Sequence, residues 1–482
     1  MFSGHVAPLH VGRPLLSRLI AMTADIDHHQ QPMKPHHAAA LVAGTSVGGG
    51  FLALPSVTAP IGFPVAATSM CAIWILLIVA ALAYAEGASR VLKDRVSSAA
   101  STEGVSIASF SRAAFGSRVS SLCTLAFVAQ ILAMVTAQLV KTAEIAAAVS
   151  AGALPYRIGC ILPALLFGVF TLRAPAIVVE RANTALTASI VGGFIVLCRN
   201  VAAGGTSCGS RLAIANWEPL LCPLAGGSTW PLPVFLSVLQ FGAAIPVIVQ
   251  GMQAHRSPLH AQRMRGALVA GAALPLVLGL LWTGVTTSQP PLSGRVAATG
   301  AEDPVLALLL GRRPIALPAQ ALSAGAIGST LIGAYLTLRQ LFADTLPHRK
   351  AQAATAVAVV GPALVGMLGP SLYLPLLSLS GAFPCTILYV LVPLLALRAL
   401  RAAGVGGEDE EDEWLPGGSA GLLAFSALPV SMLATSGATL GGSAVRLLSR
   451  LLLKLGWTGA GAAGARNALK RLLVLLKARL FW

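Results

Sequence analysis

The sequence predicts an all-α integral membrane protein with about eleven transmembrane helices. Of its 482 residues, 56% are hydrophobic and only 10% are charged, and the mean hydropathy is +0.78. A soluble domain of this length would need more charge on its surface. The chain also contains 49 glycines and 30 prolines. Both residues are common in membrane helices, where they mark kinks and breaks.

Apolar segments of roughly 18 to 25 residues match a hydrocarbon core of about 30 Å. We predict a transmembrane helix in each such segment of the chain: residues 38–57, 64–86, 119–140, 158–173, 182–199, 231–252, 266–285, 317–338, 352–369, 372–397 and 419–440. The last segment is rich in Ser, Gly and Ala and is the weakest. Eighteen Lys and Arg residues fall in loops on the side of the N-terminus and seven, with Lys141 among them, on the other side. This bias places the N-terminus on the cytoplasmic-equivalent side.

The spans group into units. We predict an N-terminal tail (1–37), a first five-helix repeat (38–199), a loop (200–230), a second five-helix repeat (231–397), an acidic loop (398–418), an eleventh helix (419–440) and a basic tail (441–482). The N-terminal tail has basic residues but no acid before Asp25, so it is either an organelle-targeting segment or a disordered cytosolic tail. Its histidine pairs lack partner ligands at metal-binding spacing, and we predict neither a metal nor a cofactor.

The first span is interrupted in its middle. The stretch Leu41–Pro55 is hydrophobic, yet Gly44, Thr45, Ser46, Gly48, Gly49 and Gly50 stand where a spanning helix needs good helix formers. A membrane helix must satisfy its own backbone, and backbone groups freed at such a break usually line a cavity that holds a ligand. The amides of the three consecutive glycines are expected at the N-terminus of the second half-helix, where the helix dipole favours a carboxylate.

Polar residues inside the next spans are candidates for the pathway, because such residues are costly in a membrane. Glu86 ends the second span and is a candidate proton carrier, although it could equally pair with Arg90 one turn further on. Gln130 and Gln138 lie two turns apart on one face of the third span. They either line the pathway or bridge helices.

An inverted-repeat transporter should have a second broken helix five spans after the first. The sixth span has Gly242 and Pro246 near its middle, preceded by Gln240 and Phe241. Proline removes an amide donor and frees a carbonyl one turn back, and such a carbonyl could bind an ammonium group. Phe241 could contact an apolar or aromatic side chain. The paired breaks therefore predict a binding site for a small zwitterionic solute, although packing kinks remain the structural alternative for each break.

The C-terminal tail differs from the rest of the chain. Arg446, Arg450 and Lys454 recur every four residues, with leucines on the opposite face, and residues 467–482 repeat this pattern. Such a basic amphipathic helix is typical of a segment that lies on anionic lipids, and a passive extension is the alternative. The net charge of +16 comes from bases between apolar runs and in this tail, so we expect membrane phosphates rather than nucleic acid as their partner.

The segment from Gly44 to Pro55 resembles the first-span motif of the hydroxy/aromatic amino acid permeases, which include tyrosine- and tryptophan-specific transport proteins of the amino acid–polyamine–organocation superfamily. Glu86, Val179–Asn183 and Leu232–Pro246 resemble further family motifs, and residues 266–282 resemble the plant and algal members. Members commonly carry a histidine after the aromatic residue of the sixth span, where this chain has Gly242.

The resemblance implies an eleven-span LeuT-like fold with broken first and sixth helices. It also implies import of aromatic (tyrosine or tryptophan) or other neutral amino acids by alternating access, coupled to protons rather than sodium. A plastid membrane, or otherwise the plasma membrane, is the expected location. The lost histidine and the added tail leave open a second hypothesis, a non-transporting sensor or scaffold of the same fold. A membrane enzyme is not expected, because the spans carry no nucleophile–base or metal constellation.

Overall fold

The computed structural model describes residues 33–97, 105–203, 215–217, 231–252, 260–288, 304–311, 313–405, 414–415, 418 and 421–436. Within these ranges the chain is helical and contains no strand, which confirms the predicted all-α class. The N-terminal tail up to residue 32, most of the loop at 200–230, the acidic run at 408–413 and the basic tail lie outside the described residues.

Every predicted span falls on a helix or a pair of helical segments. The uninterrupted ones are α4 (Phe63–Ser97), α6 (Ser117–Val149), α7 (Tyr156–Arg173), α8 (Ala176–Ala203), α13 (His260–Ser288), α16 (Arg313–Thr345) and α17 (His348–Gly366). In the described part of the chain, eight helices are long and apolar enough to cross a membrane, or nine if the bent first span is included. Neither α17 nor the shorter apolar helix Gly421–Ser436 is among them, so the count of eleven stays a prediction.

The first span is broken where the glycines predict. Helix α2 (Pro35–Ser46) ends before Val47 and Gly48, whose backbones are extended. A 3₁₀ turn, η1 (Gly49–Ala53), then leads into α3 (Leu54–Thr58). The two halves are bent by 42°. The glycines therefore stand at the start of the second half-helix, as expected.

The sixth span is also broken, within the predicted stretch Gln240–Pro246. Helix α11 (Pro231–Leu239) ends at Gln240 and Phe241, and the turn η2 (Gly242–Ala244) leads into α12 (Ile245–Met252). Pro246 opens α12, a position where a helix tolerates proline. The carbonyl of Gly242, one turn before Pro246, accepts the amide of Ile245. This carbonyl is therefore not the free acceptor that the proline suggested.

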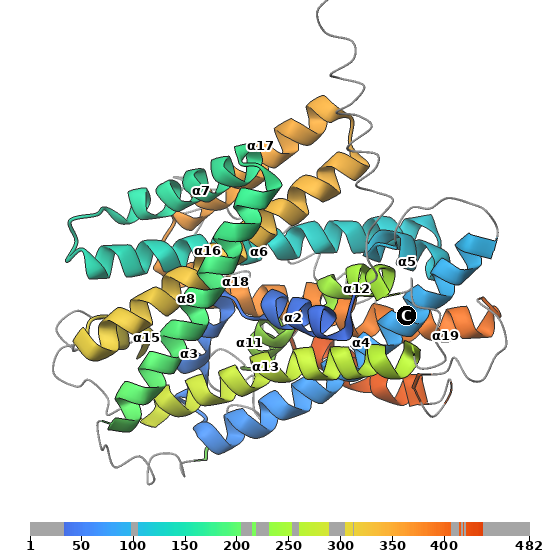
Figure 1. Ribbon diagram of the computed structural model, residues 1–482, viewed down its shortest axis with the longest axis horizontal. Helices are drawn as coiled ribbons and strands as arrows, with labels where there is room; N and C mark the ends of the chain where they lie inside the picture. Colours follow the sequence, from blue (N-terminus) through green and yellow to red (C-terminus); the bar gives the residue numbers. More distant parts are fainter. Residues whose placement is uncertain are drawn as a thin grey trace, which may run out of the picture.

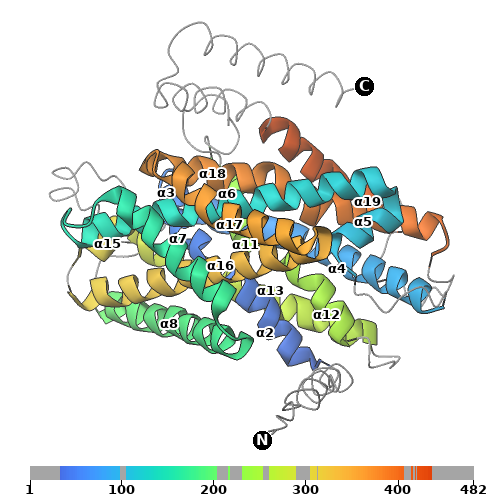
Figure 2. The ribbon, with the colours of Figure 1, turned by 90° about the horizontal axis from the view of Figure 1, so that it is seen from above.

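The two broken spans lie in the centre of the helix bundle. In Figures 1 and 2, α11 lies inside the molecule and α2 lies beside α13. The backbones of α2 and α13 are in close contact at Gly271. A Cβ at this position would lie 2.6 Å from the Ala39 carbonyl oxygen. The indole of Trp282, which is 2% exposed, donates to the Phe51 carbonyl over 2.9 Å. Helix α13 thus holds both halves of the first span.

Helices α8 and α16 pack closely along one side of the bundle, where Figure 2 shows them adjacent. Two glycines allow the contact: a side chain on Gly193 would meet the Pro318 carbonyl at 2.8 Å, and one on Gly325 would meet the Leu186 carbonyl at 2.7 Å. Small residues that bring backbones together are typical of helix packing in membranes.

The tenth predicted span changes its helical form midway. It begins with η3 (Pro370–Leu372) and α18 (Tyr373–Ser380), passes through two π-helical segments, η4 (Gly381–Cys385) and η5 (Ile387–Leu391), and ends in α19 (Val392–Ala402). A side chain on Gly381 would run into the Pro233 carbonyl of α11. The π-helical segment is therefore pressed against the first half of the sixth span.

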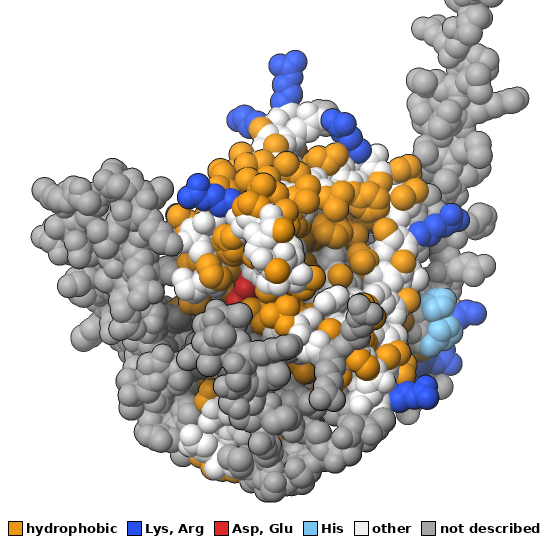
Figure 3. Space-filling model, turned by 90° about the vertical axis from the view of Figure 1, so that its left-hand side faces the viewer, with side chains coloured by type: hydrophobic (Ala, Val, Ile, Leu, Met, Phe, Trp, Pro, Cys, Tyr) orange, Lys and Arg blue, Asp and Glu red, His pale blue; other side chains and the backbone are white. Residues whose placement is uncertain are grey.

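The outer surface suits a lipid environment. In Figure 3, hydrophobic side chains gather over the upper part of the described surface, with Lys and Arg side chains around its edge. On α7, Leu162 and Leu166 are 55% and 61% exposed. Exposed apolar surfaces of this extent mark contact with a membrane.

Two short helices and one buried lysine were not expected from the sequence. Helix α5 (Ile107–Phe115) precedes the third span and α15 (Pro304–Leu309) precedes the eighth.

Lys141 was assigned to a loop, but the structure places it inside α6 with 0% exposure. Its ammonium group pairs with Glu144 at 2.9 Å and lies 5.2 Å from the ring centre of Tyr373. The pairing explains how a basic residue is tolerated within this helix.

Candidate functional site

A cavity of about 700 Å³ lies between the two breaks. Its walls come from α2 and η1, α6, α8, α11 and η2, α16 and the tenth span. The lining residues are Ala40, Leu41, Gly44, Thr45, Ser46, Val47, Gly48, Gly50, Phe127, Gln130, Ile131, Met134, Gln138, Asn183, Thr184, Thr187, Ala188, Val191, Ser237, Val238, Gln240, Ala243, Ser329, Thr330, Gly333, Ala334, Thr337, Leu377 and Tyr389. The volume is in the range of pockets that bind small organic ligands.

The structure brings most of the predicted residues to this cavity. Those in its lining are Gly44, Thr45, Ser46, Gly48, Gly50, Gln130, Gln138 and Gln240. Those outside it are Gly49, Phe241, Gly242, Pro246 and Glu86. The two glutamines of the third span therefore face the same cavity, as their spacing predicted.

Gly49 lies behind the cavity wall, held by three neighbours. Its amide donates to the Thr330 hydroxyl over 2.9 Å, and its carbonyl accepts the Tyr373 hydroxyl over 3.3 Å. A side chain at this position would run into the amide of Gln138. The prediction that this amide is free for a ligand was wrong, because a buried N–H group needs a partner and Thr330 supplies it.

The hydroxyl groups at the end of α2 face the cavity as acceptors. Thr45 and Ser46 both donate to the carbonyl of Val42, each over 3.0 Å. Their protons are therefore directed back along the helix, and the oxygen lone pairs remain to accept hydrogen bonds. Such oxygens suit an ammonium group better than a carboxylate.

The cavity carries glutamine side chains with unpaired amide atoms. Gln138 is 0% exposed, and neither atom of its amide has a hydrogen-bond partner among the described residues. The carbonyl oxygens of Gln130 and Gln240 are likewise unpaired within the described part of the chain. Native proteins seldom leave buried polar atoms without partners unless a ligand or water pairs with them. These atoms are therefore suited to bind a polar solute.

The tenth span reaches the cavity through Leu377 and Tyr389, which the sequence did not indicate. Cys385, one turn earlier, accepts a hydrogen bond from the Gln130 amide over 3.1 Å. Phe241 and Gly242 are buried, and Gly242 faces the Tyr389 ring instead of the cavity. Phe241 thus packs in the core and is not part of the cavity wall as the structure stands.

Two further walls of the cavity, on α16 and α8, were not predicted from the sequence. On α16 the lining residues Ser329, Thr330, Gly333, Ala334 and Thr337 recur every three or four positions. A second stripe, from Asn183 to Val191 on α8, follows the same spacing. Small and hydroxyl-bearing residues at helical spacing were the available signal, but the same pattern also serves ordinary helix packing.

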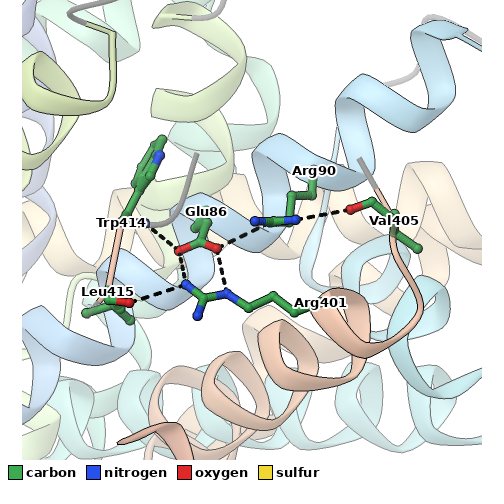
Figure 4. A network of polar contacts seen from close by, with 6 residues as sticks. All are labelled: Glu86, Arg90, Arg401, Val405, Trp414 and Leu415. Carbon is green, nitrogen blue, oxygen red and sulfur yellow. Dashed lines mark hydrogen bonds and ion pairs between the residues drawn. The ribbon is translucent and has the colours of Figure 1, made fainter. Parts of the chain in front are cut away.

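Glu86 belongs to a separate polar network (Figure 4). Its carboxylate, 1% exposed, accepts 2.9 Å and 2.8 Å hydrogen bonds from Arg401 and a 3.2 Å bond from Arg90. The backbone amide of Trp414 donates to it over 2.9 Å. The pairing with Arg90 was one of the two predicted alternatives, whereas Arg401 and Trp414 were not foreseen. The network joins α4 to α19 and to the start of the segment that leads to the last described helix.

The cavity has no charged side chain in its described lining. No group of three or more His, Cys, Asp or Glu residues that could hold a metal ion occurs among the residues that the structure describes. The polar groups of the lining are instead hydroxyls and side-chain amides, set among apolar side chains. This set fits a ligand whose net charge is zero.

The chain matches the family model for tryptophan/tyrosine permeases over residues 33–406. The chain belongs to the tryptophan/tyrosine permease family. The match includes both breaks and every residue of the cavity lining, and it confirms the resemblance carried by the first-span motif. This permease is accordingly a multi-pass membrane transporter.

Solved structures with the same fold include a manganese transporter from Eremococcus coleocola. Its crystal structure with an aromatic bis-isothiourea substituted compound has a TM-score of 0.59 at 15% identity, and the alignment covers 96% of each chain. A histidine-to-alanine mutant of that transporter has a TM-score of 0.56 at 15% identity, with 92% of this chain and 94% of that chain covered. A search of curated proteins finds no match to the permease.

Proposed function

We propose that this permease is a secondary active transporter of neutral amino acids, with aromatic ones as its main substrates. The observation that carries the proposal is the cavity between the two broken helices, whose described lining is uncharged and includes unpaired buried amide atoms. A zwitterion has no net charge but two charged groups, so it needs dipoles rather than counter-ions. Broken helices supply such dipoles at the level of the cavity.

The two ends of the substrate backbone have different partners. We assign the carboxylate to the backbone at Gly48 and Gly50, where the second half-helix begins and its dipole favours an anion. We assign the ammonium group to the oxygens of Thr45 and Ser46 and to the unpaired carbonyl of Gln240. A side chain at Gly48 would run into the Thr330 hydroxyl, and one at Gly50 would lie 3.2 Å from Val238, so the glycines let α16 and α11 pack against the break.

The substrate side chain is assigned to the part of the cavity formed by Phe127, Ile131, Met134 and Tyr389. Aromatic rings stack on aromatic side chains and make favourable contacts with the sulfur of methionine. The family to which the chain belongs supports the same substrate class.

Alternating access and proton coupling complete the proposal. The extended backbone at Val47 and Gly48 is the hinge about which the two halves of the first span would move. Coupling to protons rather than sodium follows from the family resemblance. The geometry argues against Glu86 as the carrier, because its carboxylate lies outside the cavity lining and already accepts hydrogen bonds from two arginines.

The experiment is uptake by purified protein in proteoliposomes. Labelled tyrosine, tryptophan, leucine and glutamate are offered with an inward proton gradient, with a sodium gradient and with neither. We expect uptake of the neutral amino acids, fastest for the aromatic ones and stimulated by the proton gradient, with no uptake of glutamate. Failure to transport any of them under any gradient would favour the non-transporting sensor or scaffold.

A further inference from the structure

The break in the sixth span touches the tenth span through a glycine. A Cβ on Gly242 would lie on the ring of Tyr389, within 2.7 Å of its Cγ and 3.0 Å of its Cβ, and still nearer to Cδ1. When an added Cβ would lie within about 3.0 Å of another atom, one of the two groups has to move. Tyr389 therefore occupies the room that any side chain at position 242 would need.

Tyr389 lies in a π-helical part of its span. It lies in η5, immediately after the η4 segment whose Gly381 is pressed against the Pro233 carbonyl. π-Helical turns are rare and are frequently found at functional sites. Tyr389 thus stands in an irregular stretch of helix that packs against the first half of the sixth span.

Although Tyr389 is only 4% exposed, it lines the cavity. Beside it are Gln130, whose carbonyl oxygen is unpaired among the described residues, and Ser237 of α11. Tyr389 thus lies in the cavity wall together with one amide oxygen, that of Gln130, that has no partner in the described part of the chain. Position 242 contributes no side chain to this wall.

We infer that Tyr389 determines the substrate specificity of the permease, and that Gly242 is the residue that makes room for it. The inference rests on the proposed function. The Tyr389 ring limits the length of the substrate side chain that fits, and its hydroxyl pairs with a polar atom at the far end of that side chain. A merely structural role, in which Tyr389 fills space behind the break, would affect all substrates equally.

The test compares substrates within each variant. Uptake of labelled tyrosine is measured in proteoliposomes in competition with alanine, leucine, phenylalanine and tryptophan. Tyr389→Ala should raise the preference for tryptophan over alanine by about tenfold, as expected for a change of about 1.4 kcal/mol. Tyr389→Phe, which keeps the ring, should lower the preference for tyrosine over phenylalanine by about fivefold, because one hydrogen bond is lost.

The contact with Gly242 is tested by a double-mutant cycle. Gly242→Ala alone should reduce tyrosine uptake by about tenfold or more, because the methyl group displaces the Tyr389 ring into the cavity. In the Tyr389→Ala background the same change should reduce uptake by less than about threefold. Independent, multiplicative losses would overturn the proposed contact.

Tyr335→Phe is the matched control. Tyr335 is 1% exposed and lies on α16 outside the cavity lining, so its loss of a hydroxyl should leave all preference ratios unchanged. Each variant must elute as a single species in size-exclusion chromatography. If the wild type transports tyrosine but no Tyr389 variant alters the substrate preference ratios, the inference about Tyr389 is overturned while the proposed function stands. A wild-type protein that transports none of the five amino acids would overturn the proposed function together with it.

Discussion

The guanidinium group of Arg401 donates two hydrogen bonds to the carboxylate of Glu86, from Nε to Oε1 over 2.9 Å and from Nη2 to Oε2 over 2.8 Å. These residues are 315 positions apart in the chain. The paired geometry is the strongest arrangement that arginine and a carboxylate can adopt. It fixes α4 to the end of α19.

Removal of Arg401 should destabilise the protein. Arg401→Ala leaves a buried carboxylate without its main partner, and the loss of one member of a buried ion pair costs about 3 kcal/mol or more. We expect a clear fall in the melting temperature of the detergent-solubilised protein. Arg398→Ala, at an exposed position on the same helix, is the control and should melt like the wild type. Equal melting temperatures for the two variants would contradict the structural role of the pair.

The same network predicts how uptake by Glu86→Gln responds to pH. The Glu86 carboxylate is outside the cavity lining and is held by two arginines and a backbone amide. Its neutralisation should therefore lower protein stability while uptake keeps its dependence on the proton gradient. The measurement is tyrosine uptake across a series of external pH values. A flat pH profile in this variant would instead identify Glu86 as the proton carrier.

Gln138 offers a test in which activity and stability move in opposite directions. Both of its amide atoms are buried and unpaired among the described residues. Gln138→Leu therefore replaces an unsatisfied polar side chain with an apolar one of similar size. Such a replacement is nearly neutral or stabilising. We expect an unchanged or higher melting temperature together with a KM for tyrosine raised about tenfold, for the loss of about 1.4 kcal/mol of binding. A lower melting temperature with unchanged KM would make Gln138 a bridge between helices.

Thr330 supports the break from outside the span. Thr330→Val deprives the Gly49 amide of its acceptor, and an unpaired buried donor costs about 1 to 3 kcal/mol. We expect tyrosine uptake to fall by about tenfold. Thr355→Val removes a buried hydroxyl that bonds only along its own helix, to the carbonyl of Ala351, and should retain uptake. Similar uptake by both variants would show that the Thr330 bond does not position the break.

Features that depend only on residues close to one another along the chain could be predicted from the sequence. The glycines at 48–50 cannot sustain a helix in lipid, and the spacing of Gln130 and Gln138 places both on one helix face, so the first break and one cavity wall were foreseen. The break in the sixth span was foreseen at Gln240–Pro246 as well, but Pro246 does not free a carbonyl there, because proline is compatible with the first turn of α12.

Contacts between distant parts of the chain could not be predicted. The bond from Gly49 to Thr330 and the pair of Glu86 with Arg401 depend on how helices cross, and a single sequence does not give that register. Tyr389 was missed for the same reason, since its contact with Gly242 joins the tenth span to the sixth. Lys141 was misplaced because a basic residue near the end of an apolar run is usually interfacial.

We propose that the cavity between the two breaks carries a neutral amino acid across the membrane. The most direct measurement is counterflow of labelled tyrosine into proteoliposomes loaded with unlabelled tyrosine, for the wild type and for Gly49→Leu. A side chain at Gly49 would run into Gln138, whereas Gly192→Leu, at a site with open space around it, is the control. We expect tyrosine accumulation by the wild type and the control and none by Gly49→Leu. Equal accumulation by Gly49→Leu, or none by the wild type, would contradict this proposal.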